Sequence, residues 1–82
     1  MIRVRVRLFA SLSEAAQVPE CWLVLPPGSS GGAAKFALLE RYPTLGAWLD
    51  AVRLAVNWEY QPWDASLQDG DEIGFIPPVS GG

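Results

Sequence analysis

Few side chains in this 82-residue sequence are suited to catalysis, and its most distinctive chemical group is the carboxylate of the last residue. Histidine is absent, so the chain lacks the usual general base and cannot form a Ser-His or Cys-His pair. The sequence ends on Gly81 and Gly82. Because glycine has the most conformational freedom to lose, this pair is not expected to stabilise a fold. An independent active site is therefore not predicted, and the glycine end becomes the first candidate for function.

The single thiol belongs to Cys21, inside the apolar run CWLVL. A free cysteine usually behaves as a small hydrophobic group, so we interpret Cys21 as a buried and inert strand residue rather than a reactive one. One cysteine makes no internal disulfide bond.

Two groups of charged residues are interpreted as ordinary surface features. Three arginines alternate with apolar residues over positions 3–7 and indicate a solvated strand face. Asp69, Asp71 and Glu72 surround a predicted turn, but the fuller spacing of a calcium loop is absent. No metal site is predicted.

Composition indicates one small globular domain. Apolar residues make up 50% of the chain, although a domain of this size buries only about 60 to 65% of the surface that its unfolded chain exposes. The net charge of -3 argues against a nucleic-acid partner. No apolar run approaches the roughly 18 residues of a membrane-spanning helix, and Met1 leads into a strand pattern rather than a signal peptide. We expect a cytoplasmic protein that does not contact a membrane.

The first half of the chain predicts two strands joined by a short helix. Residues 2–9 alternate between apolar and mostly arginine side chains, which is typical of a strand covered on one face. Ser11 precedes Glu14 by the capping-box spacing and opens a helix that should end before Pro19. A second strand is predicted over residues 20–25, so the two strands can form an antiparallel pair.

The segment SSGGAAKFALLERYP predicts the main helix. Ser29 or Ser30 is the expected N-cap, and Pro43 lies just beyond the expected end. Gly31 and Gly32 would each cost up to about 1 kcal/mol relative to alanine inside a helix. They favour a late start.

The second half completes an α+β pattern. Residues 51–64 predict one strand and a second short one, and residues 65–76 predict a turn at Asp69-Gly70 followed by a final strand. This order indicates a mixed β-sheet with one main helix packed on one face, and it matches the ubiquitin-like β-grasp, in which the first and last strands lie parallel at the centre. We expect the domain to cover residues 1–76 and residues 77–82 to form a flexible tail.

Strand alternation also predicts an apolar patch on the sheet face away from the helix. If Ile73 and Phe75 face the helix, Ile76 faces the other way, as Phe9 does. Apolar side chains on an open face are typical of a protein-binding surface.

Four segments together resemble the small subunit of molybdopterin synthase, also called the molybdopterin converting factor small subunit. They are LFASLSEAA, RYPTL, AVNWEYQPWD and LQDGDEIGFIPPVSGG. The resemblance covers nearly the whole chain, and DGDE followed by an apolar strand and PPVSGG is highly specific as a unit. The chain departs from the family in the main helix, where Gly31, Gly32 and Lys35 stand at positions that usually carry larger apolar residues.

The resemblance implies that the chain is a sulfur carrier whose working group is the carboxylate of Gly82. A partner adenylating enzyme of the ubiquitin-activating type would use ATP to make the acyl-adenylate, and a persulfide from a sulfur donor protein would displace AMP to leave a thiocarboxylate. The sulfur then passes to cyclic pyranopterin monophosphate in the large synthase subunit. Gly81 and Gly82 suit a narrow tunnel because they have no side chains. No cofactor is expected to stay bound to the carrier itself.

The same resemblance assigns the partner-binding residues. Tyr60 is expected beside Phe9 and Ile76 on the open face. The tail that enters the large subunit begins with Pro77 and Pro78, which favour an extended path, and continues with Val79.

Three other interpretations remain. A sulfur carrier for thiamine thiazole synthesis shares the fold and the Gly-Gly end but usually lacks PPVSGG. A ubiquitin-like protein modifier would form isopeptide bonds through its terminus. A plain interaction module would never be adenylated.

Overall fold

The alternating segment near the start of the chain forms β1, Ile2–Leu8, at the centre of a five-stranded sheet. The computed structural model describes residues 1–78. β2, Glu20–Leu25, pairs with β1 in antiparallel fashion and places Leu23 opposite Val4. A shift of one residue would turn the whole apolar set toward solvent, so burial of one face fixes this register. The predicted hairpin-like pair and the bounds of β2 are confirmed.

The short helix α1, Ser11–Ala16, begins differently from the prediction. Its N-cap is Ala10, at a φ of 49°, and no side chain caps the helix. Ser11 is already helical, so the expected capping box with Glu14 is wrong. The chain turns at Ala10, one residue before the position that the motif requires, and the Glu14 N–H donates to the Ala10 carbonyl (3.2 Å). The helix ends before Pro19, as predicted.

The main helix α2, Gly31–Arg41, uses Ser30 as its N-cap. The Ser30 hydroxyl accepts a hydrogen bond from the N–H of Ala33 (3.2 Å) and satisfies one of the N–H groups that a helix start leaves free. The N–H groups of residues 31–32 donate to main-chain carbonyls of the loop 63–65 at 3.1 and 2.9 Å. The expected late start is therefore wrong, because a distant loop binds the first turn in its helical form.

The second half of the chain supplies a 3₁₀ turn and three strands. They are η1, Pro43–Leu45, β3, Arg53–Val56, β4, Glu59–Tyr60, and β5, Glu72–Ile76. The predicted second short strand is β4. The Asp69-Gly70 turn also forms, with Gly70 at a φ of 86°. The Gly70 N–H donates a hydrogen bond to the Arg3 carbonyl (2.8 Å).

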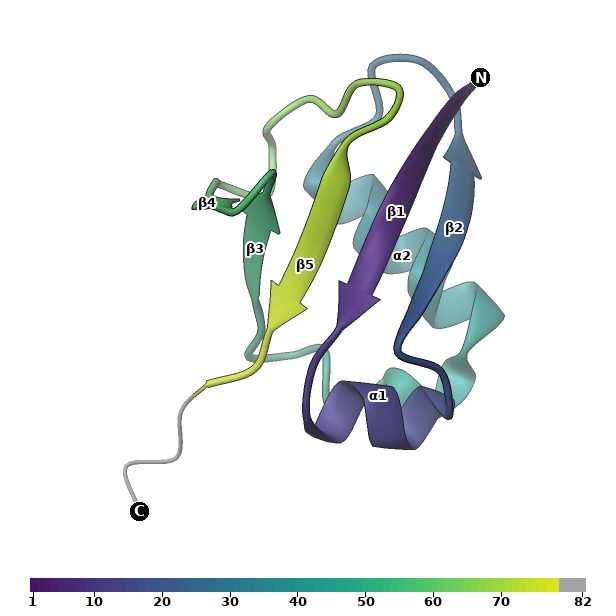
Figure 1. Cartoon of the computed structure of the whole chain (residues 1–82), viewed down its shortest axis with the longest axis vertical. Helices are drawn as coiled ribbons and strands as arrows, with labels where there is room; N and C mark the ends of the chain where they lie inside the picture. Colours follow the sequence, from purple (N-terminus) through teal and green to yellow (C-terminus); the bar gives the residue numbers. More distant parts are fainter. Residues whose placement is uncertain (79–82) are drawn as a thin grey trace.

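The sheet order is β2-β1-β5-β3-β4. β1 and β5 run parallel with Val6 opposite Ile73, whereas β3 is antiparallel to β5. Figure 1 shows β5 and β1 side by side at the middle of the sheet, and both end near α1. The predicted mixed sheet, with first and last strands adjacent at its centre, is confirmed.

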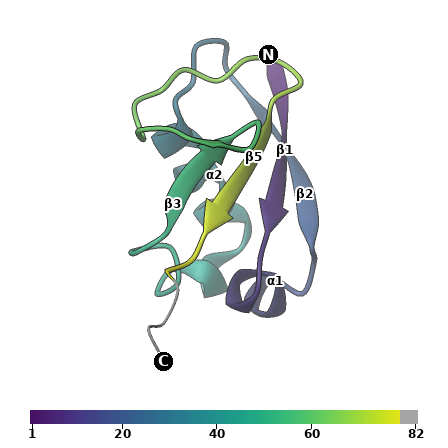
Figure 2. The same ribbon diagram turned by 60° about the vertical axis from the view of Figure 1, so that its left-hand side comes forward.

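The core lies between α2 and one face of the sheet. Figure 2 shows α2 behind β3 and β5. Its largest fully buried side chains are Phe75, Leu12, Leu38, Leu45, Leu49, Leu54 and Ile73. Ile73 and Phe75 both point into this core, so the predicted parity of the last strand is correct. Within residues 1–78, no helix has the length and apolar content needed to cross a bilayer.

Candidate functional site

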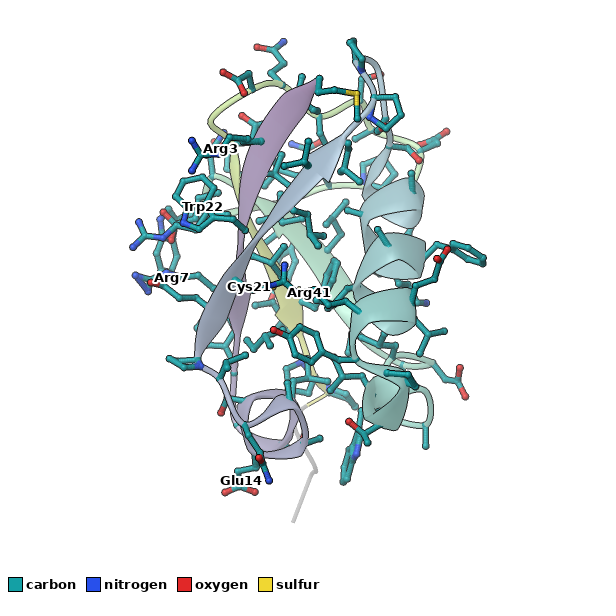
Figure 3. All side chains as sticks on the ribbon, turned by 90° about the vertical axis from the view of Figure 1, so that its right-hand side faces the viewer. Arg3, Arg7, Glu14, Cys21, Trp22 and Arg41 are labelled. Carbon is teal, nitrogen blue, oxygen red and sulfur yellow. The ribbon has the colours of Figure 1, made fainter. Side chains whose placement is uncertain are left out.

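The sheet face opposite α2, which we call the open face, carries most of the features that strand parity predicted. Figure 3 shows Arg3, Trp22 and Arg7 on this face, whereas Cys21 points between the sheet and α2. Trp22 is 45% exposed, and the guanidinium of Arg3 lies over its ring at 4.7 Å. The face is therefore a mixed aromatic and cationic surface.

Phe9 and Ile76 meet over Gly74 at the end of β5. A Cβ placed on Gly74 would lie 3.2 Å from Phe9 Cε2 and 3.4 Å from Ile76 Cδ1. Phe9 is only half-buried, although its ring comes close to the β5 backbone. The structure thus brings these two predicted residues together on the predicted face.

A small hollow opens beside this contact, and we call it the Gly74 hollow. Its lining residues are Arg7, Phe9, Ala55, Trp58, Glu72, Ile73, Gly74 and Ile76. The hollow exists because Gly74 and Ala55, which are register partners on neighbouring strands, carry little or no side chain there. Larger side chains stand around them, so the site is shaped to receive an apolar group.

The wall formed by Trp58 depends on an unusual turn between β3 and β4. Asn57 and Trp58 both adopt positive φ values, 50° and 71°. Asparagine tolerates this region, but a bulky aromatic residue rarely enters it. The Asn57 amide donates to Asp71 Oδ1 (3.0 Å) and its oxygen accepts from the Glu72 N–H (3.0 Å), which fixes the turn. Trp58 is 72% exposed as a result.

Two ion pairs neutralise part of the arginine row on β1. Arg7 Nε lies 2.6 Å from Glu72 Oε1, and Arg5 Nε lies 3.0 Å from Glu20 Oε2. The hydrogen bond from Arg5 lowers the pKa of the Glu20 carboxyl, and the same bond raises the pKa of Arg5. The side chains of both pairs are partly exposed, so each pair is expected to contribute little to stability.

Tyr60 lies on the open face as the resemblance implied, but it does not line the Gly74 hollow beside Phe9 and Ile76. It is the register partner of Ala55 and is 57% exposed. The guanidinium of Arg53 covers its ring at 4.1 Å. Arg53 is in turn the register partner of Ile76. The patch therefore includes a cation that the sequence analysis did not single out.

The acidic turn is used for structure. Asp69 Oδ1 accepts from the Arg3 N–H (2.8 Å), and Asp71 Oδ2 accepts from the Gln68 N–H (2.8 Å). Glu72 is occupied by Arg7. Across the part of the chain that the structure describes, no three His, Cys, Asp or Glu residues gather in a way that could hold a metal ion.

Cys21 is buried in β2, as predicted, with 8% of its surface exposed. Burial raises the pKa of its thiol, which lowers the fraction of reactive thiolate at neutral pH.

The predicted tail begins where β5 ends. Pro77 is half-buried and Pro78 is exposed, and neither belongs to a helix or strand. Val79, Gly81 and Gly82 lie outside the described residues, so their predicted roles stay predictions.

Three members of this surface were not predicted from the sequence, namely Ala55, Trp58 and Arg53. Ala55 and Arg53 could have been found by extending strand parity from β5 to its neighbour β3. A glycine inside the apolar strand EIGFI was also a signal, because an interior strand glycine often marks a close approach. Trp58 gives no comparable sequence signal, since its position depends on the φ values of the turn.

Comparison with known proteins identifies related sequences and folds. The model of the ThiS family matches residues 6–82. The molybdopterin synthase sulfur carrier subunit of Arabidopsis thaliana is 37% identical over 81 residues, which cover 99% of this chain and 84% of that protein.

Two solved structures share the fold over almost the full length. SAMP1 from Haloferax volcanii has a TM-score of 0.90 at 27% identity and covers 98% of this chain and 99% of its own. A chain in the complex of subunits 1 and 2 of molybdopterin-converting factor from Helicobacter pylori has a TM-score of 0.72 at 26% identity, with coverage of 99% and 100%. The predicted ubiquitin-like β-grasp fold is confirmed.

Proposed function

Because the chain belongs to the ThiS family, we propose that it is the sulfur carrier subunit of a molybdopterin synthase. The observation that carries this proposal is the full-length similarity to relatives with that name, such as the Arabidopsis protein at 37% identity. A relative of the same name from Mycobacterium tuberculosis aligns with all of this chain and all of its own. The PPVSGG ending adds the reactive group that such a carrier needs.

The chemistry is centred on the Gly82 carboxylate. A carboxylate is a poor electrophile, so an adenylating enzyme joins one of its oxygens to the α-phosphate of ATP and releases pyrophosphate. A persulfide sulfur of a donor protein attacks the acyl carbon, and AMP leaves with the original oxygen. Reduction of the acyl disulfide by a thiol then frees the donor and leaves a thiocarboxylate. Two such deliveries to cyclic pyranopterin monophosphate build its dithiolene.

The described part of the chain supports this use of the terminus. β5 is held between β1 and β3 up to Ile76, so the point from which the tail departs is fixed. Pro77 and Pro78 have no main-chain N–H groups and cannot extend the sheet hydrogen bonding. An arm that starts with two prolines has less conformational entropy to lose when it enters a partner.

The partner for sulfur delivery is the large synthase subunit. The related chain from Helicobacter pylori is described as part of a complex of subunits 1 and 2 of molybdopterin-converting factor. On this chain the surface suited to that contact is the open face around Phe9, Ile76 and the Gly74 hollow, next to the start of the tail. Tyr60 and Pro77 extend the surface on either side. The adenylating enzyme is proposed to use the same face.

A protein-modifier function is the second candidate. SAMP1, the small archaeal modifier protein 1, matches this fold with a TM-score of 0.90. The full-length sequence relatives are named as synthase subunits instead, so the modifier function is not favoured. Conjugates carrying this chain on lysine residues in host extract would support it. A carrier for thiamine thiazole synthesis is not favoured for the same reason.

Deleting Gly82, or adding one residue after it, should abolish molybdopterin synthesis without unfolding the domain. The chemistry requires a carboxylate at one position in a tunnel, whereas the core is built from residues up to Phe75. Reconstitution with the large subunit and the adenylating enzyme measures synthesis, and circular dichroism checks the fold. Synthesis by the truncated protein at the wild-type rate would contradict the carrier proposal.

A further inference from the structure

The open face is basic although the chain as a whole is acidic. The net charge is -3, yet four of the six basic residues lie on this face: Arg3, Arg5, Arg7 and Arg53. Arg5 and Arg7 are paired with carboxylates. Arg3 and Arg53 are instead stacked on aromatic rings, and within residues 1–78 neither forms an ion pair.

Arg7 lines the Gly74 hollow but is paired with Glu72. Among the arginines of the open face without an ion pair in residues 1–78, Arg53 is the one closest in register to the hollow. It stands opposite Ile76 in the antiparallel β3–β5 pair and shares a strand face with Ala55, and both of these residues line the hollow. Directly opposed residues on one face of such a pair have Cβ atoms about 4.5 to 5.5 Å apart. The Arg53 side chain is therefore adjacent to the rim of the hollow.

Stacking on Tyr60 prepares Arg53 to bind an anion. The guanidinium carbon lies 4.1 Å from the ring centroid, and the side chain remains exposed to solvent. A stacked guanidinium loses less freedom on binding, and its planar set of N–H donors matches a carboxylate in a bidentate arrangement. Arg3 is less suited to this role because its guanidinium is stacked on Trp22 of β2, on the side of β1 away from β5 and the hollow.

The hollow itself is suited to one aliphatic side chain. Gly74 provides the floor without a side chain, while Phe9, Ile76 and Trp58 form apolar walls. A glycine inside a central strand loses packing and backbone stability, and it is typical of a place where another group approaches closely. Phe9 and Ile76 lie against this floor, and the hollow opens beside them.

We propose that the Gly74 hollow and the Arg53 guanidinium form one docking site, for a protein surface that presents an aliphatic side chain beside a carboxylate. The proposal rests on the proposed function, since the partner that carries this surface is the large synthase subunit. The aliphatic group fills the hollow and the carboxylate pairs with Arg53. Because Arg53 stands opposite the last residue of β5, this pairing sets the direction in which the tail enters the partner.

Charge reversal tests the cationic half of the site. Calorimetric titration with the purified large subunit from the same host compares Arg53→Glu with the matched control Lys35→Glu, which reverses a cation stacked on Trp63 instead. Arg53→Glu should raise Kd at least about tenfold in about 50 mM KCl, and by less in about 300 mM KCl. Lys35→Glu should raise it less than about threefold. Equal effects of the two variants, or none from Arg53→Glu, would overturn the proposal.

Filling the hollow tests the apolar half. A methyl group on Gly74 would occupy the floor and press on the Phe9 ring at 3.2 Å, so Gly74→Ala should raise Kd about tenfold. Gly46→Ala is the control, because a Cβ there meets its neighbours at 3.5 Å or more, in the 3₁₀ region away from the sheet. Ala55→Val fills the hollow from its other side. It is the variant to titrate if Gly74→Ala has a much lower melting temperature than the wild type. Wild-type affinity in a folded variant of either kind would contradict the apolar half.

Failure of this site can be told apart from failure of the proposed function. Wild-type protein that binds the large subunit but never acquires sulfur on Gly82 would contradict the carrier function. The Kd values of the wild type and the variants would still test the docking site. Wild-type protein that loads and delivers sulfur, combined with normal binding by Arg53→Glu, would contradict the docking site alone.

Discussion

Gly31 shows how a single missing side chain sets the distance between α2 and the sheet. A Cβ at this position would lie 2.2 Å from Cδ2 of Leu54, which is a fully buried residue of β3. The neighbouring Gly32 has room, since its nearest atoms would be 3.6 Å away. The two glycines look equivalent in sequence, but only Gly31 is required by packing.

This difference predicts opposite effects of the same substitution. Gly32→Ala should stabilise the protein by about 0.5 to 1 kcal/mol, because alanine favours the helix. Gly31→Ala gains the same propensity but should lower the free energy of unfolding by about 1 to 3 kcal/mol, since the fully buried Leu54 side chain must shift within the packed core to make room. Urea unfolding of both variants measures the two values. If Gly31→Ala were as stable as Gly32→Ala, the close approach of α2 to β3 would be wrong.

At the scale of elements, the sequence predicted what local patterns control. Strand alternation identified β1, β2 and β5 and placed Phe9 and Ile76 on the same face, because a strand has a strict period of two. Local patterns predicted Ser30 as an N-cap of α2, which is confirmed, but they were wrong about a late start of this helix and about the cap of α1. The first turn of α2 is bound by the loop 63–65, and the start of α1 is set by a positive φ at Ala10. Neither cause is visible in a short window of sequence.

The β3–β4 turn keeps a strained residue, and we expect that strain to serve binding. Trp58→Gly creates an Asn-Gly pair, which is favoured when both turn residues have positive φ. Removing a bulky residue from the left-handed region should recover about 1 kcal/mol, which offsets the loss of an exposed contact with Arg7. Thermal stability should therefore be unchanged or higher, while affinity for the large subunit falls because the hollow loses a wall.

Melting curves and titrations of the same Trp58→Gly preparation check this prediction. Gln17→Gly is the control, since it relieves a positive φ at the end of α1 and leaves the residues of the hollow unchanged. A Trp58→Gly protein that binds as well as wild type would mean that this tryptophan does not belong to the docking surface.

At the scale of the whole molecule, the domain is a support for the chemistry that we propose at its terminus. Parallel pairing with β1 holds β5, the strand that leads into the tail. The helix α2 covers the sheet face opposite the open face (Figure 1). Burial in β2 lowers the reactivity of the Cys21 thiol. The fold, the open face and the end of the last strand could be predicted from the sequence. Arg53 could be recognised only once β3 was placed beside β5, and Trp58 only once the β3–β4 turn was known.

The most direct test of this account is to locate the sulfur after loading. The protein is incubated with its adenylating enzyme, ATP and a sulfur donor, and then analysed by intact-mass and fragmentation mass spectrometry. We predict the mass gain of one oxygen-to-sulfur exchange on Gly82, stable to mild reduction and equal in Cys21→Ser. Sulfur added as a whole atom on Cys21 and lost on reduction, or absent from a folded Cys21→Ser protein, would contradict a carrier that works through its terminal glycine.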